Sequence, residues 1–334
     1  MSRKFLLATL GESPAVITEA VDLLTEQGVR PDGVILLHTE DPDVKASLEL
    51  LLLHLPAHCR ISDVRPVSVG SYGDIDSVEA VVEFMQTVCT QLKAYREHRL
   101  FVSITGGRKA MSALLTLATQ FYGAERLFYI WVPIWMEEEG KISNLRNLGE
   151  DMLIECLHPR LDVSESDRPK LIDFPFISIF SMLTDILDAL AGQNLPPKEI
   201  RNFLESAGLL SRDGEITALG KRVLEILEQI EMLPPARQEE PELHIPSDHH
   251  YAERLNDFAR RMINFAPYIL RVTGMSWSHG EPEVRAQPPN ELIVMVRLRT
   301  DISFRLRVVT TARTPGELEA ARRHLERYVL SHGR

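Results

Sequence analysis

The sequence lacks the features that place a protein in a membrane or outside the cell. In its 334 residues, no apolar run reaches the roughly 18 residues that a membrane-spanning helix needs. The opening residues show no cleavage pattern of a signal peptide, and Phe5–Leu10 fits a first strand better. The cysteines Cys59, Cys89 and Cys156 are isolated, so they suggest neither a disulfide framework nor a metal cluster. We therefore expect a cytoplasmic protein with no membrane contact, no bound metal and no cofactor.

Lysine is also missing from one end of the chain. The net charge is −11, but it is unevenly spread. Residues 1–165 hold 15 Lys and Arg against 24 Asp and Glu, and residues 166–250 hold 8 against 15. Residues 251–334 hold 14 against 9, and all 14 basic residues there are arginine. Because guanidinium groups suit bidentate contacts with phosphate, we expect this last part to meet an anion such as nucleic acid.

The hydrophobic pattern divides the chain into three predicted domains, which together give an α/β fold class. Residues 1–163 alternate apolar strands with helices, which predicts a Rossmann-like parallel sheet covered on both faces. Residues 170–233 have helices and a small hairpin in an order that resembles a winged helix-turn-helix. Residues 247–334 predict a small α+β domain with an antiparallel sheet. Polar, proline-containing tethers are predicted at Ser164–Pro169 and Pro234–Pro246.

The same pattern predicts individual elements. In the first domain the strands are Phe5–Leu10, Gly33–His38, Val64–Val69, Leu100–Thr105 and Leu127–Pro133. Its helices are Pro14–Gln27, Pro42–Leu53, Ser77–His98 and one that follows Gly106-Gly107 and runs through Phe121. The second domain has helices at Ile179–Leu190, Pro196–Ala207 and Leu219–Ile230. The third has helices at Tyr251–Arg271 and Pro315–Ser331, with strands at Met275–Ala286, Glu291–Arg299 and Ile302–Thr311.

Two turns of the first domain each follow a strand and open a helix. They are Thr9–Pro14 and Ser103–Lys109. In doubly wound sheets ligands bind at this position, where backbone N–H groups and a helix N-terminus can hold an anion. Gly106 and Gly107 would allow close approach, and the two basic residues that follow would supply countercharge. Neither turn matches G-x-G-x-x-G or a P-loop, which disfavours a dinucleotide cofactor or an ATPase; tight turns that simply need glycine are the alternative.

The strings ATLGESPAVITEAVDLL and SITGGRKAMSALL resemble the CRISPR-associated Rossmann fold (CARF) sensor domains, over roughly Lys4–Pro133. The resemblance implies a homodimer whose two Rossmann units bind cyclic oligoadenylate made by type III CRISPR complexes, with cyclic tetra-adenylate as the first expectation. Some such sensors slowly cleave their ligand, and the sequence leaves binding and cleavage open. The ligand-binding residues that the resemblance implies are Thr9, Leu10, Gly11, Ser13, Pro14, Thr39, Glu40, Thr105, Gly106, Gly107, Arg108, Lys109, Met111 and Ser112.

Four arginines of the third domain follow the alternation of its strands. Arg297 and Arg299 are two residues apart, as are Arg305 and Arg307, so each pair shares one side of its strand. Like charges on one face cost stability unless an anion is to bind there. A solvated sheet face is the alternative interpretation.

The string MVRLRTDISFRLRVV is similar to the active sheet of the RelE family of ribosome-dependent mRNA endonucleases. The resemblance implies a metal-independent attack of an RNA 2′-OH on the neighbouring phosphate, with arginines stabilising the transition state. The chain departs from the family at Met295, where a basic residue is usual, and no last strand is evident after Thr311. The implied catalytic residues are Arg297, Arg299, Arg305, Arg307 and Tyr328, and the implied RNA-binding residues are Arg313, Arg322, Arg323 and Arg327.

Two other nucleic-acid interpretations are disfavoured. The middle domain is too acidic for a DNA-binding helix, so we expect a spacer instead. Arg327 and His332 match the R-x4-H pattern of the helical HEPN ribonucleases, but the surrounding strands contradict a helical domain.

The sequence therefore predicts a type III CRISPR ancillary effector of the CARF–RelE type: a dimeric mRNA interferase that cyclic oligoadenylate activates and that acts on mRNA in the ribosome. The alternatives are a cyclic-oligoadenylate-responsive transcriptional regulator and a ring nuclease that degrades the signal. We further hypothesise that the acidic tether, with Glu239, Glu240 and Glu242, restrains the arginine-rich domain until ligand binds.

Overall fold

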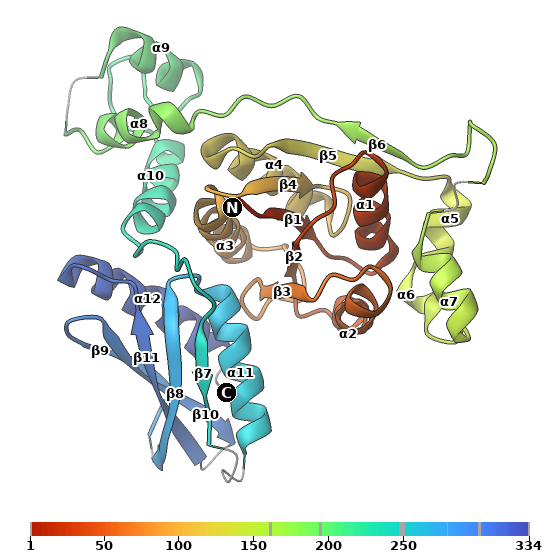
Figure 1. Cartoon of the computed structure of the whole chain (residues 1–334). Coiled ribbons are helices and arrows are strands. Elements are labelled where there is room, and N and C mark those ends of the chain that lie inside the picture. The colour runs from red at the N-terminus through yellow and green to blue at the C-terminus, as the bar shows by residue number, and fades with distance from the viewer. Residues whose placement is uncertain are drawn as a thin grey trace.

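Two separate sheets, linked by a helical segment, form the framework of the molecule (Figure 1). The computed structural model describes residues 2–159, 162–193, 196–246, 251–278, 280–299 and 302–332. The first sheet has the strand order β3-β2-β1-β4-β5-β6, and the second has the order β7-β8-β11-β10-β9. The α/β fold class with a parallel first sheet and a separate second sheet is thereby confirmed. Within the described ranges, none of the helices is both long and apolar enough to cross a bilayer.

The first five strands are parallel. They are β1 (Lys4–Thr9), β2 (Gly33–His38), β3 (Asp63–Ser68), β4 (Arg99–Ser103) and β5 (Arg126–Trp131). All six residues of β2 are buried, because helices cover both faces of the sheet. This double cover is the reason why these strands read as continuous apolar runs rather than as an alternation.

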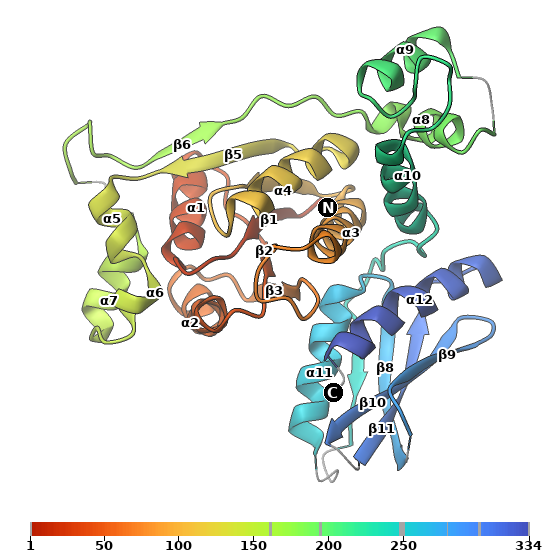
Figure 2. The same cartoon turned by 180° about the vertical axis from the view of Figure 1, so that it is seen from behind.

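Helices lie in two layers on opposite sides of the first sheet (Figure 2), and successive residues of β1 pack against different layers. Leu6 and Ala8 belong to a core with α1 (Ala15–Glu26) and α2 (Pro42–His58). Phe5 and Leu7 belong to the other core, with α3 (Val78–Tyr95) and α4 (Lys109–Tyr122). Helix α2 runs beyond its predicted end at Leu53, since Leu55 still packs into the core.

The region after β5 was not predicted. It forms three short helices, α5 (Ile134–Glu139), α6 (Ile142–Leu145) and α7 (Glu150–Leu157), which lie beside α1 and α2. The chain then returns as β6 (Lys170–Asp173), which pairs antiparallel with β5. The predicted boundary of the first domain falls before β6, whereas this strand belongs to the first sheet.

The middle segment is helical, in the predicted order. It contains a short 3₁₀ turn (Phe180–Met182), α8 (Leu183–Leu190), α9 (Lys198–Ser206), a single bridge between Leu210 and Ile216, and α10 (Ala218–Glu231). Helix α10 docks on the first domain, where Gln86 of α3 bonds Gln229 at 2.7 Å and the hydroxyl of Tyr122 bonds Glu231 at 3.0 Å. The winged-helix assignment itself stays a prediction.

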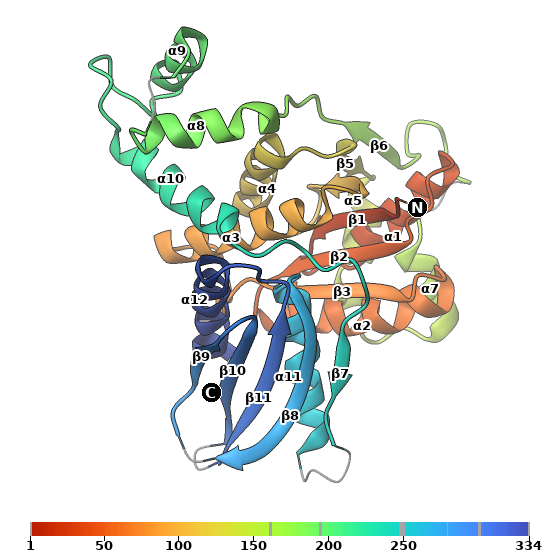
Figure 3. The ribbon, with the colours of Figure 1, turned by 60° about the vertical axis from the view of Figure 1, so that its left-hand side comes forward.

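Among the described residues, helices cover one face of the second sheet and leave the other face open (Figure 3). Its strands are β7 (Glu242–His244), β8 (Ile269–Ser278), β9 (Glu283–Gln287), β10 (Glu291–Arg299) and β11 (Ile302–Thr310), and its helices are α11 (Ala252–Phe265) and α12 (Pro315–His332). The covered face is apolar and its residues are buried: Leu292, Val294, Val296, Phe304, Leu306 and Val308.

Three predictions for this part need correction. The helix predicted to reach Arg271 ends at Phe265, because Pro267 cannot donate a helical hydrogen bond, and β8 begins at Ile269. The single strand predicted over Met275–Ala286 is the end of β8 followed by β9. The segment Pro234–Pro246, predicted to be a tether without a strand, carries β7, which pairs in parallel with β8.

Candidate functional site

The two predicted turns line one cavity of about 550 Å³ at the carboxyl ends of β1 and β4. The turn after β1 leads into α1, and the turn after β4 leads into α4, so both helix N-termini face this region. The side chain of Arg108, the N-cap of α4, makes no capping hydrogen bond. Nine of the predicted ligand-binding residues line the cavity: Leu10, Gly11, Ser13, Thr39, Thr105, Gly106, Gly107, Arg108 and Met111.

The turns come together because glycines leave room for the backbone. A Cβ on Gly106 would lie 2.0 Å from the carbonyl oxygen of Thr9, and one on Gly11 would lie 2.8 Å from the nitrogen of Gly107. Gly107 also has a φ of +78°, which a residue with a side chain rarely adopts. The hydroxyl of Thr9 donates to the carbonyl of Gly106 at 2.5 Å, which ties the turns together. The glycines are therefore required by the packing as well as available to a ligand.

Several of the side-chain hydroxyls predicted to bind the ligand form hydrogen bonds with the backbone instead. Ser13 donates to the carbonyl of Gly140 at 3.0 Å, and Ser112 donates to that of Ile104 at 2.7 Å. Thr105 accepts from the N–H of Ile130 at 2.7 Å. Thr9 is buried behind the cavity. The two remaining predicted residues of the turns, Pro14 and Lys109, lie at the starts of α1 and α4 beside the lining residues.

Glu40 is not among the lining residues, although its neighbours Thr39 and Asp41 are. Its carboxylate is bound by Lys45 at 2.5 Å and by the hydroxyl of Ser68 at 2.7 Å. Burial alone would raise the pKa of Glu40, but these hydrogen bonds lower it below its ordinary value. His332, at the end of α12, lies 3.9 Å from the same carboxylate and 3.2 Å from the hydroxyl of Ser68. Glu40 thus joins the first sheet to the last helix.

Sequence reasoning missed most of the charged residues in the cavity wall. The missed charged residues are Glu12, Asp41, Asp43, Glu137 and Lys141. Part of this charge is already paired: Arg108 lies 3.2 Å from Asp74, and Asp43 lies 2.6 Å from Arg146. The motif at Asp41-Pro42, a cap followed by proline, marks a helix start and could have indicated Asp41. The cavity is therefore not strongly basic, and backbone N–H groups are its most consistent donors toward an anion.

A buried carboxyl group lies on α1. Glu19 is 2% exposed, and its Oε2 has no hydrogen-bond partner among the described residues. Burial, followed by the charges of Glu137 and Asp22, raises its pKa to about 8. Glu19 is therefore largely protonated at neutral pH.

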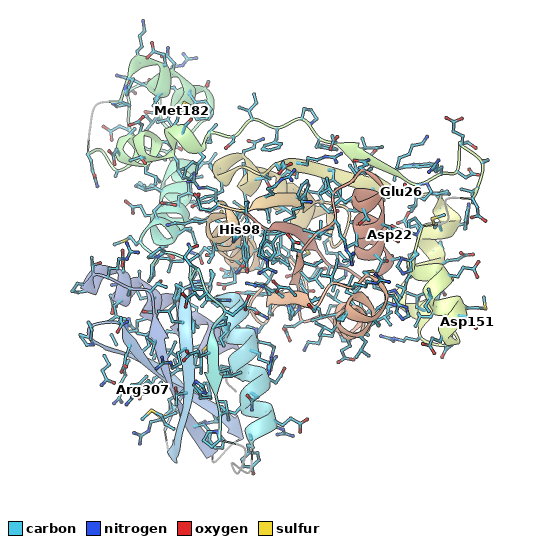
Figure 4. All side chains as sticks on the ribbon, viewed as in Figure 1. Asp22, Glu26, His98, Asp151, Met182 and Arg307 are labelled. Carbon is cyan, nitrogen blue, oxygen red and sulfur yellow. The ribbon has the colours of Figure 1, made fainter. Side chains whose placement is uncertain are left out.

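Three of the four predicted arginines share the open face of the second sheet. Arg297 is opposite Ser303, Arg305 is opposite Met295, and Arg307 is opposite Ile293. Residues directly opposite in an antiparallel pair point to the same side, and no helix of the described part of the chain covers this side. The side chain of Arg299 lies outside the described residues. Figure 4 shows Arg307 on this face.

Carboxylates accompany these arginines. Glu281 binds Arg297 at 2.6 Å, and Glu291 lies 3.8 Å from Arg307. On neighbouring strands Arg271 pairs with Glu242 of the tether at 2.6 Å, so one of the three tether carboxylates reaches this domain. The face is consequently a network of exposed ion pairs, and an anion that binds there must exchange with carboxylates.

Tyr328 does not fit the predicted catalytic role. It is buried on the helix-covered side of the sheet, stacks on Phe265 and His332, and its hydroxyl has no partner among the described residues. The predicted RNA-binding arginines of α12 also lie apart from the open face. Arg322 and Arg323 pair with Glu319, whereas Arg327 lies 3.7 Å from Glu83 of α3. Arg313 is exposed just after β11.

One cysteine has metal-binding neighbours that the sequence did not reveal. Cys59 lies with His54 and His158, and their ligand atoms are all within 4.8 Å of one another. The cysteines were expected to take part in no metal cluster; that expectation stays a prediction, although Cys59 is not isolated from metal-binding side chains in space. Burial, and next the nearby His158, lowers the pKa of His54 to about 4, and burial raises that of the Cys59 thiol to about 12. The string HLPAHC at 54–59 is the signal that could have found it.

Together these features define a two-sheet α/β protein with a cavity at the carboxyl ends of its parallel strands. The model of the CRISPR-associated protein NE0113 family (Cas_NE0113) matches residues 13–209, more than half of the chain. The chain belongs to this family. The CRISPR association predicted from the two turn motifs is thus confirmed, whereas the RelE-like part stays a prediction.

The chain was also compared with curated proteins and with solved structures. No curated protein matches the chain. Among solved structures, the chain is similar to Enterococcus italicus Csm6 bound to cyclic hexa-2′-fluoro-hexa-dAMP, with 15% sequence identity and a TM-score of 0.38. The match covers 70% of this chain and 56% of that chain, so this chain spans little more than half of that protein.

Proposed function

We propose that the protein is a type III CRISPR ancillary effector in which cyclic oligoadenylate, bound at the first sheet, activates a ribonuclease on the open face of the second. The observation that carries the proposal is the convergence of both turns of the CARF-like motif on one cavity in a member of a CRISPR-associated family. Sequence resemblance alone had joined these turns, and the fold brings them into contact at Gly11 and Gly107.

The cavity supports a phosphate ligand through its backbone. N–H groups at the starts of α1 and α4 can bind phosphate oxygens, while Arg108 exchanges Asp74 for the ligand. A ring of four nucleotides is larger than one cavity of about 550 Å³. We therefore propose that two copies of the chain meet over a two-fold axis and that each supplies half of the site.

The open face supports RNA cleavage without a metal. Arg297 and Arg305 lie on paired strands, on the same side, where two guanidinium groups can approach one phosphate. They would stabilise the charge that develops when the neighbouring 2′-OH attacks and the 5′ oxygen leaves. Met295, directly opposite Arg305, supplies no charge, so the arginines must do this alone. The substrate we propose is mRNA in the ribosome.

The proposal is tested by following mRNA cleavage in translating ribosomes with and without cyclic tetra-adenylate. We expect cleavage only with the ligand, and we expect Arg297→Ala combined with Arg305→Ala to lower its rate by at least about 100-fold. Arg254→Ala combined with Arg260→Ala is the matched control, because it removes the same charge from exposed positions of α11 on the other face. The control should cleave like the wild type.

Three results would contradict parts of this proposal. Cleavage that persists in the Arg297 and Arg305 double variant would exclude the active-sheet assignment. Ligand turnover with no effect on mRNA would identify a ring nuclease. Ligand-dependent DNA binding without cleavage would identify a transcriptional regulator.

A further inference from the structure

A group of metal-binding side chains lies where α1, α2 and α7 meet. His54 is on the last part of α2, Cys59 directly follows α2, and His158 directly follows α7. The Nε2 atoms of the two histidines are 2.9 Å apart, although the residues are 104 positions apart in the sequence. We propose that His54, Cys59 and His158 bind a zinc ion that fastens α7 to α2 within the first domain.

The donor set suits zinc. Zinc binds imidazole nitrogen at about 2.0–2.1 Å and thiolate sulfur at about 2.3 Å, so ligand atoms around a tetrahedral ion are roughly 3.3–3.8 Å apart. The three ligand atoms start from separations of 2.9 Å to at most 4.8 Å, and side-chain adjustments of an ångström or less bring them into that range. Calcium and magnesium prefer oxygen ligands, so this group favours a softer ion.

A carboxylate orients one of the ligands. Nδ1 of His158 lies 2.5 Å from Oδ2 of Asp22, a residue of α1 (Figure 4). This hydrogen bond places the ring proton on Nδ1 and leaves the Nε2 lone pair toward His54, where the ion would lie. Carboxylate, histidine and metal in this order form the usual outer-sphere support of zinc sites. Asp22 is therefore a positioning residue for the ion.

The site also has an open side. His54 is 4% exposed, but Cys59 and His158 are only partly buried, so a water molecule can complete a tetrahedron around zinc. Helix α7 closes the segment that begins at Ile134, and Ile134, Glu137 and Lys141 of this segment line the ligand cavity. An ion at His158 would thus hold the outer wall of that cavity in place. This role does not depend on which ligand the cavity takes.

The experiment uses the full-length untagged protein, stripped with a chelator and titrated with Co²⁺ as the spectroscopic probe. We expect about one Co²⁺ per chain, with the visible bands of tetrahedral cobalt and a near-ultraviolet thiolate-to-cobalt band, both of which Zn²⁺ abolishes by displacement. Zinc should raise the Tm of the stripped wild type by about 5 °C.

Substitutions identify the side chains that bind the metal ion. Cys59→Ser should remove the thiolate band and weaken metal binding by at least about 10-fold, and Asp22→Asn should keep the band and weaken binding by about 10–100-fold. Cys156→Ser is the matched control, because Cys156 is a buried cysteine of α7 outside the group. It should keep both the band and the affinity.

The wild-type titration decides the proposal even if a variant fails to fold. Absence of stoichiometric cobalt binding to the wild type would overturn it. A thiolate band that survives in Cys59→Ser, or that disappears in Cys156→Ser, would also overturn it, because the sulfur ligand would then be a different one.

Discussion

The candidate sites at the two sheets differ in whether backbone or side chains form them. At the first sheet, the cavity depends on backbone: Gly106 and Gly11 let two turns touch, and the hydroxyl of Thr9 serves a carbonyl rather than a ligand. At the second sheet, the candidate site consists of solvent-exposed side chains on the face opposite the buried apolar residues. A site made of backbone cannot be altered without disturbing the fold, whereas a site made of exposed side chains can. The difference predicts how strongly substitutions in each region change the free energy of unfolding.

The largest effect is expected for Gly106→Ala. The new Cβ would meet the carbonyl oxygen of Thr9 at 2.0 Å, and neither backbone can move freely. We expect a loss of about 3 kcal/mol in the free energy of unfolding, measured by urea denaturation, and a loss of binding of cyclic tetra-adenylate. Gly73→Ala is the control: Gly73 also lines the cavity, but its Cβ would meet nothing within 4 Å. Equal stability of the two variants would contradict a backbone-built site.

An intermediate effect is expected for Glu19→Gln. The folded pKa of Glu19 is about 8, above the ordinary 4.5 of the unfolded chain. Between these values the unfolded chain releases the proton and the folded chain keeps it, so the wild type loses stability as the pH rises from about 5 to 8. The buried amide lacks a partner at every pH, so we expect Glu19→Gln to be less stable than the wild type by about 2 kcal/mol at pH 4. At pH 9, where the wild type has lost about 4–5 kcal/mol, we expect the variant to be more stable by about 2–3 kcal/mol.

Urea denaturation at several pH values measures this difference. Glu26→Gln serves as the control, because Glu26 is exposed on the same helix. A gain from Glu19→Gln that is the same at pH 4 and pH 9 would show that Glu19 is ionised in the folded protein. The first domain would then tolerate a buried charge.

The smallest effect is expected for Arg305→Ala. Its side chain is exposed, and the apolar layer beneath it stays intact. We expect the free energy of unfolding to change by less than about 0.5 kcal/mol while RNA cleavage falls. A loss above about 1 kcal/mol would mean that this arginine is part of the framework and would remove the distinction between the two sites.

The sequence predicted best those elements whose hydrophobic pattern depends on a single environment along the whole element. The apolar runs at Phe5–Leu10 and Gly33–His38 predicted buried strands, and the alternation of Glu291–Arg299 predicted a strand with one solvent-exposed face. It failed where tertiary pairing decides: β7 and β6 are short polar segments that become strands because β8 and β5 offer free edges. The ending of α11 could have been found, because Pro267 stops the helix.

The candidate sites show the same limit. The glycine-containing turns were found, since backbone geometry leaves a mark on residue type. The carboxylates of the cavity and the pairing of Cys59 with His158 were not found, because distant residues meet only through the packing of α7 on α1 and α2. Tyr328 was misplaced since α12 lies on the covered face, which the arginine pattern does not reveal.

The contact at Glu40 lies between the two domains that carry the candidate sites. Glu40 stands between Thr39 and Asp41 of the cavity wall and also faces His332 at the end of the helix that covers the second sheet. A ligand that displaces this segment must change the free energy of the contact with His332. If the proposed ligand changes the affinity for RNA through this contact, reciprocity requires that RNA change the affinity for the ligand by the same factor. Under the proposed function, the supply of RNA would then also change how tightly the signal molecule binds.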